Sequence, residues 1–147
     1  MPMGGPPPDI GARVYRATNQ TIVTATLTAI SFSNERYDTD TIWVLGAPTR
    51  LTCRTPGKYL IGACVRLDNI TDLIQYECML REGGATIVAY ELRHSGQTGG
   101  KMLCISTIYD LATADYLEVL VQHAAGADRD VISTGNYSPE FWMQKVG

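Results

Sequence analysis

The sequence predicts an all-β fold, an antiparallel jelly-roll sandwich of about ten short strands. The chain has 147 residues, 45% of them hydrophobic, which is enough for one domain with a substantial core. Runs rich in Thr, Val, Ile and Tyr recur about every ten residues and are divided by Gly, Asn and Asp. No long stretch carries the apolar stripe of an amphipathic helix, so strands are the predicted elements throughout.

The first third of the chain is predicted from alternation and from its breaks. Residues 14–16 form a short first strand, and residues 21–33 alternate well enough to form a longer one. Residues 34–40 are polar around one aromatic ring, so we expect a loop there. A small apolar segment at 42–44 and a strand at 50–53 complete this region.

The middle of the chain carries the clearest turn signals. Thr55-Pro56-Gly57 predicts a Pro-Gly turn of type II character. Residues 58–67 then form a long strand that is apolar on both faces, as in strands covered on both sides. Residues 74–81 and 85–92 are predicted to form a hairpin, because Glu82-Gly83-Gly84 lies between them.

The last third alternates between glycine-rich loops and apolar strands. The predicted segments are a loop at 93–100, strands at 104–111 and 116–122 around a turn at 112–115, a loop at 124–130, and a final strand at 137–146 that Pro139 interrupts.

The amino-terminal segment differs from the rest in composition. We expect residues 1–11 to be a Pro- and Gly-rich arm and residues 12–147 to be the head domain. Pro6, Pro7 and Pro8 cannot form a helix and favour an extended chain that loses little entropy on docking. With Asp9 they are the predicted partner-binding arm.

The beginning of the chain lacks the charged and apolar regions of a secretory signal, and no run approaches the roughly 20 apolar residues of a membrane helix. We therefore expect synthesis in a cytoplasm and no membrane contact. The four cysteines, Cys53, Cys64, Cys78 and Cys104, lie in apolar strand-like runs. Their even number allows two disulfides with three possible pairings, but a reducing compartment favours four buried free thiols.

The net charge and the fraction of charged residues indicate which kinds of partner to expect. Lys and Arg number 12 and Asp and Glu number 15, giving a net charge of −3, so we expect no nucleic-acid partner. Only 18% of the residues are charged, below the roughly 25% that is usual for soluble domains. A surface so poor in charge favours contacts with other subunits.

Three blocks of sequence resemble the globular head of complement component one, subcomponent q. Residues 51–61, LTCRTPGKYLI, match its signature of Thr, Cys, two residues, Pro-Gly, one residue, Tyr and an apolar run. The matching positions are Cys53, Pro56, Gly57 and Tyr59.

The two later blocks follow in the order that the family shows. Residues 106–119 resemble its late hairpin and include Tyr116, although Ala114 stands where the family usually has Gly. Residues 137–143 are similar to its aromatic closing strand and include Phe141 and Trp142. The resemblance covers residues 12–147.

The resemblance implies a ten-stranded jelly roll, shared with the tumour-necrosis-factor fold, that assembles as a tight homotrimer. Stand-alone heads of this type occur in bacterial and phage genomes, and the late blocks are similar to the virion-associated ones. The secreted animal members usually carry a collagen stalk, which is not found in this sequence.

Loop carboxylates are the candidate cation ligands. Asp38 with Asp40, and Asp68 with Asp72, are pairs of the kind that calcium prefers, and some members of the family bind calcium at the trimer apex. Loop aspartates more often cap turns, so we expect no cofactor.

Catalytic residues are not indicated. Glu118 and Asp110 could form an acid/base pair, but no histidine or nucleophile accompanies them, and Ser106 lacks an elbow motif. We therefore expect no enzyme activity. Most aromatic residues are expected in the core and the trimer interface, with an exposed subset available for stacking on sugars: Trp43, Tyr76, Tyr90, Tyr109, Tyr116, Tyr137, Phe141 and Trp142.

These observations lead to one expected function and one alternative. We expect a non-enzymatic structural protein of a phage virion, assembled in the cytoplasm of the host bacterium. It would be a homotrimeric capsid decoration or head-fibre knob that attaches by its base and arm to the major capsid protein or another virion protein. The alternative is the receptor-binding tip of a tail fibre that recognises host surface carbohydrate.

Overall fold

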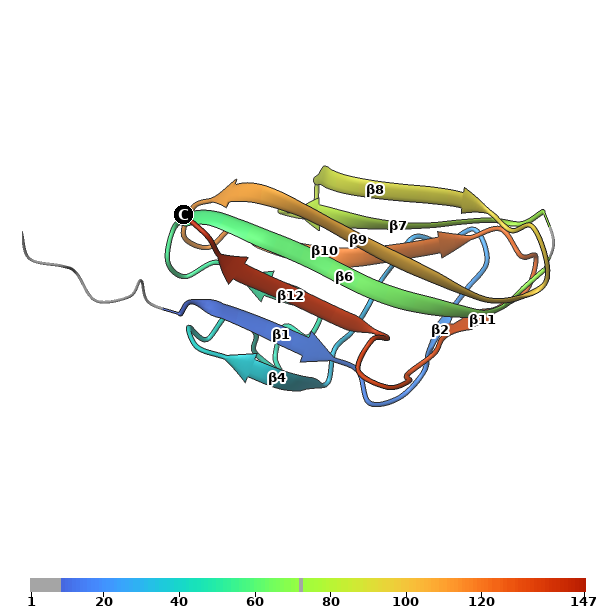
Figure 1. The fold of residues 1–147 in the computed structure, drawn as a ribbon, viewed down its shortest axis with the longest axis horizontal. Helices are drawn as coiled ribbons and strands as arrows, with labels where there is room; N and C mark the ends of the chain where they lie inside the picture. The colour runs from blue at the N-terminus through green and yellow to red at the C-terminus, as the bar shows by residue number, and fades with distance from the viewer. Residues whose placement is uncertain (1–8, 72) are drawn as a thin grey trace, which may run out of the picture.

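The computed structural model describes residues 9–71 and 73–147, which form twelve strands in two stacked sheets (Figure 1). Neighbouring strands are antiparallel throughout the described chain. The all-β jelly-roll prediction is confirmed. Among the described residues, no helix is long and apolar enough to cross a membrane.

The larger sheet has seven strands in the order β2-β11-β6-β12-β1-β4, and β9 also pairs with β6. The long β6 pairs with β12 through Tyr59–Cys64 and with β11 at Leu67, while β9 lies along its other edge. The strands are β1 (Gly11–Tyr15), β2 (Gln20–Ile22), β4 (Asn34–Asp38), β6 (Gly57–Ile70), β9 (Gly99–Leu111), β11 (Arg129–Val131) and β12 (Glu140–Lys145).

The smaller sheet has five strands in the order β3-β10-β7-β8, with β5 also paired to β10. Its strands are β3 (Thr28–Ala29), β5 (Arg50–Thr52), β7 (Gln75–Glu82), β8 (Thr86–His94) and β10 (Tyr116–His123). The predicted β7–β8 hairpin is confirmed. Three residues, 83–85, connect the two strands, and Gly83 and Gly84 both adopt positive φ, 62° and 75°, which glycine adopts without steric cost.

The core lies between the sheets and follows the period of two along each strand. Tyr59, Ile61 and Ala63 of β6 point inward and are fully buried, as are Val119 and Val121 of β10. Burying such side chains stabilises the fold by roughly 1.5–3 kcal/mol for each large apolar group. The intervening residues of β6 point away from the core, so the second apolar face predicted for this strand lies on the outside of the sheet.

Two predictions for the first third of the chain are wrong. Residues 21–33 are not one strand, because a turn with Ala25 at a φ of 55° separates β2 from β3. Residues 34–40 are not a loop throughout, because β4 pairs with β1 at the edge of the larger sheet. Its side chains are mostly exposed, so the polar composition reflects an edge strand.

Smaller differences concern strand ends and turns. The strands at 58–67 and 104–111 extend further than predicted. β11 begins inside the expected loop at 124–130, and the apolar segment at 42–44 is not a strand. The turn before β6 differs from type II, because Gly57 has a φ of 154°. Glycine is required there, since a Cβ would collide with the carbonyl oxygen of Gly147.

The carboxyl terminus and the beginning of β1 lie at the same end of the sandwich (Figure 1). Asp9 is held there, because its carbonyl accepts a hydrogen bond from the Thr39 hydroxyl at 2.6 Å and its carboxylate accepts one from Gln144 Nε2 at 2.7 Å. Pro6, Pro7 and Pro8 lie outside the described residues, so the docked arm and the boundary between arm and head stay predictions.

Candidate functional site

The outer surface of the seven-stranded sheet carries an exposed apolar pair, a tryptophan, an arginine–carboxylate cluster and a disulfide. We call it the seven-strand face and define it by the outward-pointing residues of β1, β6, β9 and β12. Register places these residues in rows across the strands. The rows are Gly11, Gln144, Leu60 and Ile108; then Arg13, Trp142, Gly62 and Ser106; then Tyr15, Glu140, Cys64 and Cys104; then Arg66 and Met102.

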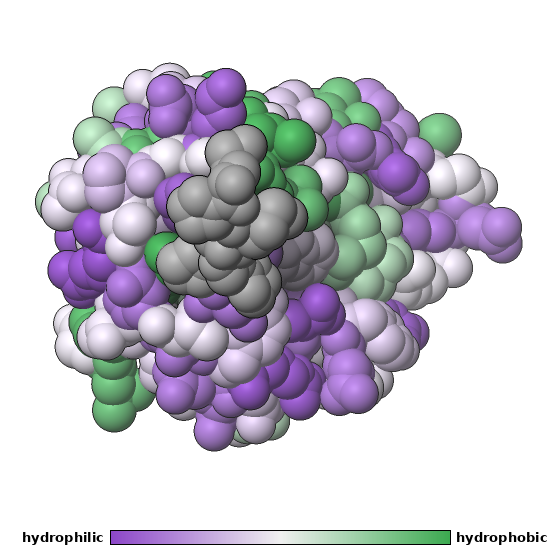
Figure 2. Space-filling view, turned by 60° about the vertical axis from the view of Figure 1, so that its left-hand side comes forward, coloured by the Kyte–Doolittle hydropathy of each residue, from purple (hydrophilic) through white to green (hydrophobic). Residues whose placement is uncertain are grey.

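An apolar pair lies open to solvent on this face. Leu60 and Ile108 are directly opposite each other on β6 and β9, and they remain 38% and 61% exposed. Figure 2, turned to bring the end with the termini forward, shows hydrophobic side chains among polar ones on the right, where this sheet faces outward. Exposed aliphatic side chains that lie side by side on a sheet face are typical of a surface that another molecule covers.

Trp142 lies beside this pair, and the position of its ring depends on a glycine in the neighbouring strand. Gly62 is its partner in the ladder, and a Cβ at Gly62 would collide with the indole ring. The absence of a side chain therefore lets the ring lie across the strand. The ring is half-buried, and the guanidinium of Arg13 stands 5.1 Å from its centroid.

A buried carboxylate organises the charged part of the face. Glu140 is only 1% exposed although it points outward from β12. Arg13 Nε donates to Glu140 Oε1 at 2.8 Å, and Arg36 donates to both carboxylate oxygens at 3.2 and 3.1 Å. These partners compensate for the desolvation of the charge.

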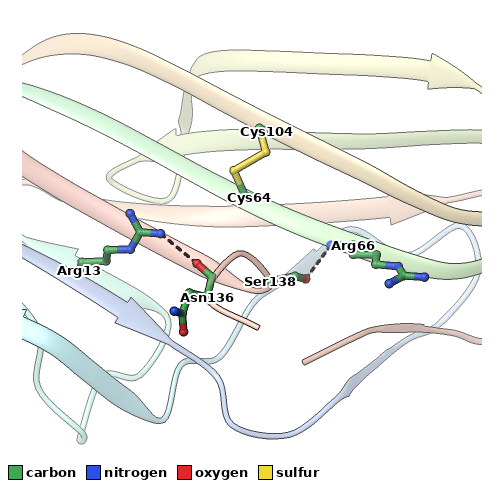
Figure 3. The surroundings of a disulfide bond; sticks show 6 residues. All are labelled: Arg13, Cys64, Arg66, Cys104, Asn136 and Ser138. Atoms are coloured by element: carbon green, nitrogen blue, oxygen red, sulfur yellow. Dashed lines mark hydrogen bonds between the residues drawn. A yellow bond between two sulfur atoms is a disulfide. The ribbon is translucent and has the colours of Figure 1, made fainter. Parts of the chain in front are cut away.

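Both arginines are fixed further by their neighbours. Arg13 also donates to the carbonyl of Asn136 at 3.2 Å (Figure 3), and the Arg36 guanidinium lies 3.9 Å from the centroid of the Tyr15 ring. The hydrogen bond with Glu140 raises the pKa of Arg36 above its ordinary value. The result is a preorganised cluster that carries one excess positive charge at neutral pH.

A disulfide joins Cys64 of β6 to Cys104 of β9 on the same face (Figure 3). The expectation of four free thiols is therefore wrong for this pair. The two residues are directly opposite in the ladder with Cα atoms 4.2 Å apart, a proximity that the sequence separation of 40 does not reveal.

The other two cysteines are free and buried, as predicted. Burial raises the pKa of the Cys78 thiol to about 12, and burial also raises the pKa of Cys53 above its ordinary value. Both thiols are therefore poor nucleophiles in the folded chain.

The residues of the recognised signature mostly build the core. Cys53, Tyr59 and Phe141 are fully buried, and Phe141 packs on Phe32 with ring centroids 5.5 Å apart. The Tyr59 hydroxyl donates to the carbonyl of Thr55. Pro56 is exposed beside Gly57, and Tyr116 lies under Arg50, whose guanidinium is 4.0 Å from its ring centroid. Of the signature residues, Trp142 alone points out onto the seven-strand face.

The carboxylates that suggested calcium have other partners. Asp38 accepts hydrogen bonds from the backbone N–H groups of Asp40, Ile42 and Trp43, and Asp40 accepts one from the Thr55 hydroxyl. Asp38 therefore caps a turn. Asp72, the expected partner of Asp68, lies outside the described residues. Within 9–71 and 73–147, no three His, Cys, Asp or Glu side chains are grouped to hold a metal ion.

The acid/base pair considered above does not come together. Glu118 is on β10 of the smaller sheet, where it accepts hydrogen bonds from Thr49 at 2.7 Å and Arg81 at 3.2 Å. Asp110 is on β9 of the larger sheet, opposite Lys58. The two carboxylates therefore belong to separate environments.

Sequence reasoning missed the arginine–carboxylate cluster. Arg13 and Arg36 lie 127 and 104 residues from Glu140 along the chain. Glu140 stands beside Phe141 in the predicted closing strand, but this position gave no information about its partners.

No family model and no curated protein sequence matches this chain. Solved structures do match its fold. Murine APRIL at pH 5.0 superposes with a TM-score of 0.69 at 9% identity, covering 95% of this chain and all of that one. Eiger TNF from S. frugiperda gives 0.63 at 12% identity, covering 95% and 94%.

The globular domain of zebrafish complement 1qA protein gives a TM-score of 0.59 at 13% identity, covering 94% of this chain and 98% of that one. These values show a shared fold over nearly the whole chain at identities too low to carry function. The chain therefore has the jelly-roll fold found in tumour-necrosis-factor-like and complement 1q globular domains.

Proposed function

We propose that the protein is a non-enzymatic structural subunit that forms a homotrimer through its seven-strand face. The observation that carries the proposal is the exposed Leu60 and Ile108 pair, with Trp142 beside it, on neighbouring strands of the seven-strand face. Three copies related by a three-fold axis would cover these side chains in closed contacts.

The chemistry of the face supports burial by a second copy. The Glu140 carboxylate is already satisfied by two arginines, so a second copy that covers the cluster needs to supply an acceptor for only one excess positive charge. The low charged fraction of 18% also favours a large contact area between copies.

We further propose that the trimer belongs to a phage virion as a capsid decoration or head-fibre knob, assembled in the bacterial cytoplasm. The head takes up nearly the whole chain, and the first described residues emerge beside the carboxyl terminus (Figure 1). That end would be the base, from which the arm reaches the major capsid protein or another virion protein.

Two measurements test these statements separately. Sedimentation at micromolar concentration should give a particle of three times 16.1 kDa, and a stable monomer would contradict the trimer. Electron microscopy of particles that carry the labelled protein should place it on the head. A location at the tail, or no incorporation, would contradict the virion role as stated.

The alternative is a carbohydrate-binding tip, which the exposed rings of Tyr90 and Tyr137 favour, at 52% and 47% exposure. Aromatic faces of this kind stack on sugar rings. Binding to host surface glycans that is lost in Tyr90→Ala or Tyr137→Ala, while the trimer persists, would support the tip and overturn the decoration role.

A further inference from the structure

The disulfide on the seven-strand face is open to solvent in the single chain. Cys104 is exposed and Cys64 is half-buried, and both point outward from the middle of the β6–β9 ladder. A reductant or a small thiol can therefore reach the sulfur of Cys104 directly.

The remaining thiols cannot exchange with this disulfide. Cys78 of β7 and Cys53, which follows β5, are fully buried in the core, and burial raises the pKa of each thiol. Exchange requires a thiolate with access to the sulfur that it attacks. The redox chemistry of the folded chain is therefore confined to one couple, Cys64 with Cys104.

The disulfide lies close enough to Leu60 and Ile108 for one subunit contact to cover both. Cys64 and Cys104 lie four residues along their strands from Leu60 and Ile108, roughly 13 Å at the rise of a β-strand. A subunit contact of standard size buries about 800 Å² on each partner, a patch that extends roughly 16 Å from its centre. A second copy centred on Leu60 and Ile108 would therefore cover the disulfide as well.

We propose that assembly seals the Cys64–Cys104 couple, so that only the unassembled subunit exchanges electrons with the redox environment. This inference rests on the proposed trimer. A small-molecule disulfide, such as oxidised glutathione, is the co-reactant. One protein thiolate attacks it, forming a mixed disulfide and releasing one thiol, and the second protein thiolate displaces the other. The protein loses two electrons and two protons, and the small disulfide is reduced to two thiols.

The test measures how fast a phosphine reduces the bond in the folded protein. The phosphine attacks one sulfur and the S–S bond breaks. Water supplies the oxygen of the phosphine oxide and the protons of the two thiols, which mass spectrometry counts after alkylation. The wild-type protein is compared with Ile108→Asp, which places a charge in the proposed contact. Leu45→Asp is the matched control, because Leu45 is 71% exposed on the loop before β5.

We expect the wild type and Leu45→Asp to sediment as trimers and to be reduced at least about tenfold more slowly than the monomeric Ile108→Asp, because access limits the reaction. Equal rates in trimer and monomer would overturn the inference while leaving the trimer intact. A wild type that sediments as a monomer would instead overturn the proposed function.

A second measurement needs no variant, and it decides the matter if Ile108→Asp does not fold or stays trimeric. The wild-type protein is diluted through the concentration at which sedimentation shows the trimer dissociating. The reduction rate should rise at the same concentration. A rate that stays constant across that transition would overturn the inference.

Discussion

The two outer faces of the sandwich differ in how far the single chain covers them. On the smaller sheet, the outward-pointing residues of the central strands are already buried, with Met79 at 6% and Leu120 at 1% exposure. On the seven-strand face, Leu60 of the interior strand β6 stays open beside Ile108 of the edge strand β9. The smaller sheet exposes large apolar side chains at its own edge strand β8, where Ile87, Tyr90 and Leu92 are 40–52% exposed. The two faces therefore differ at their interior strands, because only the seven-strand face leaves an outward apolar side chain of an interior strand, Leu60, open to solvent.

The charges on the two faces also differ. Glu118 on the smaller sheet is paired with Arg81 and Thr49, and Glu77 accepts a hydrogen bond from the Tyr90 hydroxyl. On the larger sheet, one carboxylate holds two arginines that stay about one-third exposed at their side chains. The arginine side chains of both sheets are similarly exposed, Arg81 at 26%, so the two faces differ in the number of arginines that each carboxylate holds.

The largest expected effect tests which face is the contact. Ile108→Asp should weaken assembly by at least about 100-fold, because each contact would bury an unpaired carboxylate at a cost of several kcal/mol. Sedimentation equilibrium measures the change. Leu45→Asp makes the same kind of substitution beside the smaller sheet and should leave the trimer unchanged. If Leu45→Asp dissociates the trimer and Ile108→Asp does not, the assignment of the two faces is reversed.

The next effect concerns the disulfide that crosses the seven-strand face. Replacing both cysteines, Cys64→Ser with Cys104→Ser, should lower the free energy of unfolding by about 4 kcal/mol, because the bond closes a loop with a sequence separation of 40. Urea unfolding in the monomeric Ile108→Asp background measures it. Reduced protein should match the double variant, and the double variant should not respond to reductant. A double variant as stable as its parent would show that the bond adds no stability.

Replacing the buried carboxylate of the larger sheet, Glu140, should cost more stability than replacing that of the smaller sheet, Glu118. We expect Glu140→Gln to destabilise the monomer by roughly 2–3 kcal/mol, because two partly exposed arginines lose their counter-ion. Glu118→Gln should cost about half as much, since it has one arginine partner and keeps an acceptor for Thr49. Equal losses in urea unfolding would mean that the second arginine contributes nothing.

The core thiol gives a pH effect that is independent of either face. The folded pKa of Cys78, about 12, exceeds its ordinary value of 9.0, so ionisation favours the unfolded chain. Its contribution to stability is complete below pH 9 and is lost as the pH rises toward 12. Between pH 8 and pH 10 we expect a loss of about 1 kcal/mol. In Cys78→Ala, the free energy of unfolding should fall by about 1 kcal/mol less than in the wild type between pH 8 and pH 10. The same pH dependence in both proteins would contradict a raised pKa of Cys78.

The smallest effect is expected from the arm. Deleting residues 1–9 removes the exposed hydrogen bonds that Asp9 makes with Thr39 and Gln144, which together contribute about 1 kcal/mol or less. The melting temperature should therefore be nearly unchanged, and the trimer should stay assembled. We expect attachment to the virion to fall, as measured by occupancy on particles. Unchanged occupancy would assign attachment to the base of the head, and a dissociated trimer would assign the arm to the trimer contact.

The elements that could be predicted are those whose signals are local. Alternation located β6, β7, β8 and β10, and two glycines located the β7–β8 turn, because side-chain period and positive φ act within a few residues. Local signals failed for β4, whose polar residues suit an edge strand as well as a loop. They also failed at Ala25, where a turn interrupts a run that alternates without a break.

The sequence by itself determined that the chain folds into two antiparallel sheets around an apolar core, since binary patterning selects the fold class and the inward face of each strand. Only the tertiary structure decided which outward residues meet. Cys64 pairs with Cys104, and Glu140 with Arg13 and Arg36, through a register set by strands that are distant along the chain. Register follows from the packing of both sheets together, so no local pattern specifies these contacts.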